Sequence, residues 1–231
     1  MSEVTKTENK NQKKYFAFGI VIICLALAGL ISLGSLAVES LKGISNEDKR
    51  QAEYEKFLAP VVMLDPELFD DVTNADMEDL LNASILSILA DNESTPYDFD
   101  FVEGETSGIA IPKEIVESKF VTLFGTDVKP EHQSVECSTC VFEYQNAANR
   151  YVIPLTGYDP AYVPDVTKID KSGEGAVALT VGYIAYGDWE LSENKFTQPE
   201  PIKYRKITLR INETGYYVSA VQNSDATRVT K

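Results

Sequence analysis

Apolar residues occur in this chain first as one continuous run and then at periodic positions. Residues 15–38, YFAFGIVIICLALAGLISLGSLAV, contain no Asp, Glu, Lys or Arg. An α-helix rises about 1.5 Å per residue, so about 20 apolar residues cross a bilayer core that is roughly 30 Å thick. The run therefore predicts one transmembrane helix over residues 15–38, and the rest of the chain is expected to be tethered to a membrane or passed across it.

The charges beside this run predict its orientation. Lysines are frequent in residues 1–14, and Lys13 and Lys14 adjoin the run directly. Positive charge beside a span tends to remain cytoplasmic, so residues 1–14 are expected to form a cytoplasmic tail and residues after about 40 to lie outside. A cleaved signal peptide is the alternative, because Ser35-Leu36-Ala37 has small residues at the spacing that a signal peptidase uses. An uncleaved anchor is preferred, because the apolar core of a signal peptide usually spans only about 7 to 15 residues.

After the span the pattern becomes helical and then strand-like. Helical spacing predicts a stalk helix within residues 39–64, interrupted at Pro60, and two further helices that end near Asp91 and Gly125. From residue 134 the period changes to two, which predicts strands at 134–137, 141–144, 151–154, 166–169, 176–186, 202–211 and 216–221. Helices followed by antiparallel strands predict an α+β domain over residues 65–231, with helices covering one face of a strongly curved sheet.

This order of elements resembles a known class of domain. Helices followed by a strand meander, which finishes in the hairpin KITLRINETGYYVSAV at residues 206–221, resemble the cone-shaped NTF2-like or cystatin-like domains often found on bacterial envelope proteins. The resemblance covers roughly residues 75 to 222 and implies an extracytoplasmic domain behind the transmembrane helix. Some NTF2-like relatives are enzymes with polar residues inside the cone. No position here matches their catalytic residues, so no catalytic residue is predicted and an enzyme is not favoured.

The composition of the chain limits the classes of partner that it is expected to bind. The chain has 21 basic and 36 acidic residues and a net charge of −15, and most of the acids follow the span. Such a surface repels nucleic acid and anionic lipid head groups, so a nucleic-acid role is not expected.

Cys137 and Cys140 form the sharpest local motif. In an extended strand, residues three apart have Cα atoms roughly 10 Å apart, beyond the disulfide limit of about 7 Å. The two cysteines can bridge only if Ser138-Thr139 forms a tight turn. Because strand-like residues flank the pair, the sequence predicts a hairpin tip closed by a disulfide, with free thiols as an alternative.

Redox and metal functions are the other interpretations of this motif. A redox motif needs a helix N-terminus to lower the thiol pKa, but Val141-Phe142 prefers a strand. His132 with the cysteines and Glu131 or Glu136 could supply zinc ligands, but a second cysteine pair is missing. No metal site and no cofactor are therefore predicted.

Aromatic and basic side chains are the candidate partner-binding positions. Tyr and Trp combine a large contact area with a polar tip, as protein and glycan recognition requires. Basic residues between 203 and 210 could meet an anionic wall polymer or an acidic partner, although pairing with the domain's own acids is the alternative. The positions selected are Tyr158, Tyr162, Tyr186, Trp189, Lys206 and Arg210.

The sequence thus predicts a single-pass plasma-membrane protein that presents a non-catalytic α+β binding or scaffolding domain outside the cytoplasm. Its partner would be a protein or a cell-wall component, and one specific version is a regulator of cell-envelope enzymes. An exported enzyme is the rival, and it requires a deep NTF2-like pocket lined by a buried Asp or Glu with Tyr. The third class is a structural subunit of a membrane assembly, for which Ala28 and Ser32 offer a small-x-x-x-small helix contact.

Overall fold

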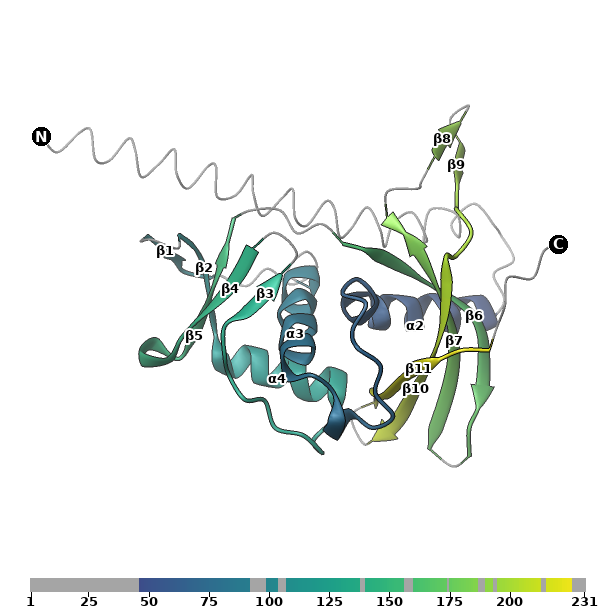
Figure 1. The fold of residues 1–231 in the computed structure, drawn as a ribbon, viewed down its shortest axis with the longest axis horizontal. Helices are drawn as coiled ribbons and strands as arrows, with labels where there is room; N and C mark the ends of the chain where they lie inside the picture. Colours follow the sequence, from purple (N-terminus) through teal and green to yellow (C-terminus); the bar gives the residue numbers. More distant parts are fainter. Residues whose placement is uncertain are drawn as a thin grey trace, which may run out of the picture.

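Three α-helices lie between two antiparallel sheets in the part of the chain that the computed structural model describes (Figure 1). That part comprises residues 46–91, 99–103, 107–137, 140–155, 160–173, 175–186, 190–192, 195–212 and 215–225. The predicted cytoplasmic tail at 1–14 and the predicted transmembrane helix at 15–38 lie outside it. Within the described residues, no helix has both the length and the apolar character that a membrane span requires.

The helices begin and end at local signals. Helix α2 covers Asn46–Val62, α3 covers Met77–Asp91 and α4 covers Lys113–Phe124, while η1 (Val72–Asn74) and η2 (Asn146–Ala148) are short 3-10 turns. The Asp71 carboxylate caps η1 by accepting the Thr73 N–H at 3.0 Å. Gly125 ends α4 with a φ of 77°, and a Cβ there would lie 2.8 Å from the Tyr217 ring. Only glycine combines that backbone with so close a ring.

The first sheet has five strands in the order β1-β2-β5-β4-β3. The strands are β1 (Phe101–Val102), β2 (Gly108–Pro112), β3 (Val135–Cys137), β4 (Cys140–Gln145) and β5 (Arg150–Pro154). Helix α3 packs beside β3, and α4 beside α3 and β2.

The second sheet has four strands in the order β11-β10-β7-β6. The strands are β6 (Tyr162–Lys171), β7 (Ala176–Ala185), β10 (Lys203–Asn212) and β11 (Gly215–Asn223), and a separate hairpin joins β8 (Glu190–Ser192) to β9 (Lys195–Thr197). Phe69 extends the β11 edge through two backbone hydrogen bonds with Val221, each 2.9 Å.

The α+β class is confirmed, but the single curved sheet is wrong. Every predicted strand overlaps an observed one, yet β3, β4 and β5 belong to one sheet and β6, β7, β10 and β11 to the other. A period of two shows that a strand has one buried face, but it does not identify the strand's neighbour. Each sheet buries that face against helices, so the helices form the middle of the molecule (Figure 1).

The region expected to be a stalk contributes a helix to the core. Helix α2 continues through Pro60 to Val62, and Leu58 and Val62 are fully buried. It packs against β6 and α3. This part of the chain therefore belongs to the folded unit.

Candidate functional site

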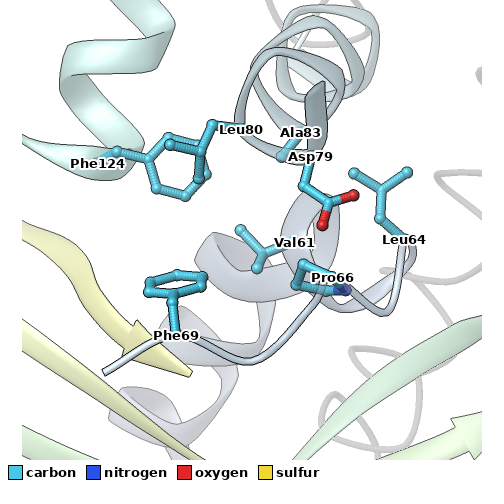
Figure 2. Close-up of a pocket in the computed structure, with 8 residues that line it drawn as sticks. All are labelled: Val61, Leu64, Pro66, Phe69, Asp79, Leu80, Ala83 and Phe124. Carbon is cyan, nitrogen blue, oxygen red and sulfur yellow. The ribbon is translucent and has the colours of Figure 1, made fainter. Parts of the chain in front are cut away.

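A shallow apolar hollow lies where the end of α2 meets α3 and α4 (Figure 2). Its lining is aliphatic or aromatic except for Asp79, and it is too small to hold a water molecule. The Asp79 carboxylate accepts the Glu67 N–H at 2.9 Å, and burial raises its pKa. The enzyme alternative requires a deep pocket lined by an acid and a tyrosine, and this hollow supplies neither the depth nor the tyrosine. The lining residues are Val61, Leu64, Pro66, Phe69, Asp79, Leu80, Ala83 and Phe124.

A more polar arrangement, here named the Tyr183 cluster, lies at one end of the four-stranded sheet. Tyr183 of β7 pairs in register with Lys203 of β10 and with Pro164 of β6. Successive strand residues point to opposite faces, so Lys203 and Arg205 lie on the same face of β10 as the buried Ile207. The cluster consists of Asp65, Tyr162, Tyr183, Lys203 and Arg205.

Lys203 is the central cation of the Tyr183 cluster. Its Nζ lies 4.5 Å from the Tyr162 ring centroid and 5.1 Å from that of Tyr183. It also forms an ion pair with the Asp65 carboxylate, and the two side chains are 25% and 30% exposed. The rings and Asp65 therefore hold the ammonium group at the border between the core and solvent.

Two hydrogen-bond donors of the Tyr183 cluster have no partner among the described residues. They are the hydroxyl of Tyr183, whose side chain is fully buried, and the buried Nε of Arg205. Burial raises the pKa of Tyr183, so its hydroxyl remains protonated and can donate. Arg205 uses Nη1 to donate to the Asn223 side chain.

A second polar cluster surrounds His132. Its Nε2 lies 3.1 Å from a Glu117 carboxylate oxygen, and its Nδ1 lies 3.0 Å from the Tyr151 hydroxyl oxygen. The Tyr144 ring stacks on the imidazole with centroids 5.2 Å apart. A neutral imidazole that donates from Nε2 to Glu117 must accept the Tyr151 O–H at Nδ1. The geometry is that of a proton relay, but Tyr151 is fully buried, so the arrangement fastens α4 to β5.

His132 lies in the polar segment at residues 129–133, where an exposed side chain is the usual expectation, yet its imidazole is largely buried. The imidazole is only 10% exposed because Tyr144 and Tyr151 reach it from β4 and β5. The His-Tyr-Glu combination was missed because its members are separated in the sequence. No local spacing signals the contact.

A pair of carboxylates lies where α2 meets β6. Glu55 accepts the Val166 N–H at 3.0 Å, which covers a backbone donor of the β6 edge strand. Burial raises the pKa of Glu55, and also that of the neighbouring Asp165. Among the described residues, no group of three or more His, Cys, Asp or Glu side chains is placed to hold a metal ion.

The structure joins Cys137 and Cys140 by a disulfide across the β3/β4 hairpin. The two residues face each other in the strand register, with Cα atoms 4.9 Å apart. The hairpin packs on α3, where Asn82 donates to the Glu136 carbonyl at 2.9 Å and Glu78 accepts the Glu136 N–H at 2.6 Å. The tight turn that the spacing requires is therefore compatible with the observed register.

The four predicted partner-binding residues that the structure describes do not form one surface. Tyr162 belongs to the Tyr183 cluster, and the Tyr186 N–H donates to the Ala161 carbonyl at 3.2 Å at the same end of the sheet. Lys206 and Arg210 are exposed on the opposite face of β10 from Lys203. Tyr158 and Trp189 lie outside the described residues.

The described part of the chain is an α+β domain with one aromatic and cationic end. Comparisons with protein-family models, curated proteins and solved structures gave no match.

Proposed function

We propose that this chain is a single-pass membrane protein that displays a binding or scaffolding domain outside the cytoplasm. The observation that carries the binding function is the Tyr183 cluster, where Tyr162 and Lys203 reach the surface at one end of the sheet. Cationic and aromatic side chains that are held in place beside unpaired hydrogen-bond donors are typical of a recognition site. The partner is a protein or a cell-wall component.

Two further features support the location. The uncharged run at residues 15–38 has the length of a membrane anchor. Disulfides such as Cys137–Cys140 persist in oxidising compartments and are rare in the cytosol. The run favours a membrane anchor, and the disulfide favours a folded domain outside the cytoplasm.

Impermeant maleimide labelling of intact cells tests the topology. The full chain would carry Cys24→Ala and one new cysteine, either Lys10→Cys in the head or Lys206→Cys on the exposed face of β10. We expect label at position 206 in intact cells and at position 10 only after permeabilisation. The reverse pattern would place the domain in the cytoplasm and remove the proposal.

Site-specific photo-crosslinking tests the binding end. A photoreactive amino acid at Tyr186, beside the Tyr183 cluster, is compared with one at Val121, which is exposed on α4. We expect a discrete crosslinked species from position 186 in membranes and none from position 121. Equal crosslinking from both positions would indicate random collision and would count against a recognition site at this end.

A further inference from the structure

The unpartnered donors of the Tyr183 cluster indicate what the site binds. More than nine in ten buried polar groups in proteins have a hydrogen-bond partner, because an unpaired one keeps its desolvation penalty. Here the Tyr183 hydroxyl and the Arg205 Nε are both buried and unpartnered among the described residues. They project from the same face of adjacent strands, since Tyr183 pairs with Lys203 and Arg205 is the next residue on that face. Two neighbouring donors of this kind fit an acceptor supplied from outside the chain.

The charges define the acceptor further. Lys203 and Arg205 contribute two positive charges to the cluster, and Asp65 contributes one negative charge. One positive charge remains while Asp65 is in place and two remain when Asp65 turns towards solvent, so the site favours a ligand group with a negative charge. A carboxylate has this charge, and its two oxygens can accept several hydrogen bonds at once.

Asp65 shows that a carboxylate fits against Lys203. It lies on the segment after α2, outside the sheet, with a φ of 54° in the left-handed region. Non-glycine residues adopt that conformation at some cost, although Asp tolerates it better than most. Because the Asp65 and Lys203 side chains are both partly exposed, Asp65 can swing towards solvent while the strands stay paired.

We propose that a carboxylate of an external ligand exchanges with Asp65 and binds to Lys203, Arg205 and the Tyr183 hydroxyl. The inference rests on the proposed binding function, because it names the chemical group recognised at that same end of the domain. Asp65 then acts as an internal carboxylate that occupies Lys203 until the ligand arrives. The hydroxyl of Tyr183 is retained for the ligand at a cost to the stability of the free protein.

A titration of the full chain in detergent micelles tests the proposal. The probes are N-acetylglycine, which carries a carboxylate, and its neutral amide, at constant ionic strength. Thermal unfolding reports binding, because a ligand that binds only the folded state raises Tm with concentration. We expect N-acetylglycine to raise Tm and the amide to have no effect.

Three variants identify the site. Tyr183→Phe removes only the hydroxyl, and we expect Kd to rise about tenfold with no fall in the Tm of the free protein. Asp65→Asn removes the competing carboxylate and keeps a residue that tolerates the left-handed backbone, so Kd should fall about tenfold. Lys171→Ala removes an exposed positive charge from the opposite end of β6 to Tyr162 and should leave Kd unchanged.

The outcomes separate this inference from the proposed function. The carboxylate site is overturned if the amide acts like N-acetylglycine, if Tyr183→Phe binds like the wild type, or if neither probe raises Tm at about 0.1 M. The maleimide experiment is independent of these results. A cytoplasmic domain would remove the proposed location while leaving the titration intact.

Discussion

At the scale of single residues, two fully buried tyrosines differ in whether the hydroxyl has a hydrogen-bond partner, and this difference should affect stability. Tyr151 and Tyr183 are both completely buried, and burial raises the pKa of each. The Tyr151 hydroxyl contacts His132, whereas the Tyr183 hydroxyl has no partner among the described residues. The same substitution should therefore have opposite consequences at the two positions.

We expect Tyr151→Phe to lower the free energy of unfolding by about 1–2 kcal/mol, because it removes the hydrogen-bond partner of the largely buried His132 Nδ1. Tyr183→Phe should change that free energy by less than about 0.5 kcal/mol or increase it, because no hydrogen bond is lost. Urea unfolding of both variants with the wild type measures the difference. Equal destabilisation at the two positions would show that the Tyr183 hydroxyl has a partner within the protein.

The Glu55 carboxylate predicts a pH dependence of stability. Burial raises its pKa above the ordinary value of 4.5, so the folded state binds the proton more tightly than the unfolded state does. This contribution to stability is complete below pH 4.5 and is lost as the pH rises through the folded-state pKa. Glu55→Gln keeps an acceptor for the Val166 N–H without the charge, and it should stabilise the domain at pH 7 by roughly 0.5 kcal/mol after solvent screening.

Urea unfolding between pH 4.5 and 7.5 checks this prediction. Glu53→Gln is the matched control, because Glu53 is exposed on the same helix and its removal changes the net charge equally. If the free energy of unfolding at pH 7 increases equally in both variants, the effect comes from net charge and not from the burial of Glu55.

At the scale of elements, the β3/β4 hairpin combines a disulfide with docking on α3. The Cys137–Cys140 bridge closes a very short loop, so it restricts the unfolded chain by about 2 kcal/mol at most. The hydrogen bonds from Asn82 and to Glu78 hold the same hairpin independently. We expect the double variant Cys137→Ala/Cys140→Ala to fold with about 1–2 kcal/mol less stability in urea.

The control for the bridge is the wild-type chain unfolded with and without a reductant. Reduction should reproduce the loss seen in the double variant, and a reductant should have no effect on that variant. Identical stability of oxidised wild type and double variant would show that the bridge does not constrain the unfolded chain.

The sequence predicted which segments form strands better than it predicted which strands pair with one another. Alternation after Ser134 was sufficient to find the seven predicted strands, whereas β2 was missed because Gly108 to Ile111 are all buried and do not alternate. The division into two sheets depends on which strands pair, and a period of two is the same in either arrangement. The candidate site was predicted only in part for a related reason, since Tyr162 was selected but its grouping with Tyr183, Lys203 and Arg205 was not. Lys203 and Arg205 face the core-lining side of β10, but their charge had suggested solvent.

At the scale of the whole molecule, the direction of α2 indicates which end of the folded domain lies nearer to the proposed membrane anchor. The Met63 carbonyl, just after the C-terminal end of α2, accepts the Ala161 N–H at 3.1 Å near the Tyr183 cluster. Earlier in the helix, the Tyr54 and Phe57 rings lie 5.3 and 4.7 Å from the Tyr216 ring, at the turn end of the β10/β11 hairpin. The N-terminus of α2 therefore lies at the hairpin end, and the Tyr183 cluster lies at the other.

This direction predicts which end of the domain faces the bilayer. Residues 39–45, between the proposed span and α2, reach at most roughly 25 Å when fully extended. The hairpin end should lie next to the membrane, and the Tyr183 cluster should project away from it, where a partner can approach. Two isoleucines report the difference, because Ile211 is 57% exposed at the hairpin end of β10 and Ile202, just before β10, is 58% exposed beside the cluster.

Energy transfer to the lipid surface measures this orientation. The full chain with Cys24→Ala and either Ile211→Cys or Ile202→Cys would carry a donor fluorophore and be reconstituted in phosphatidylcholine vesicles with head-group acceptors. Positions 202 and 211 are about 30 Å apart along the strand, so transfer should be much more efficient from position 211. Equal transfer from both positions in a chain that floats with the vesicles would overturn the orientation. Failure to float would instead remove the anchor, since an uncleaved span cannot leave the bilayer.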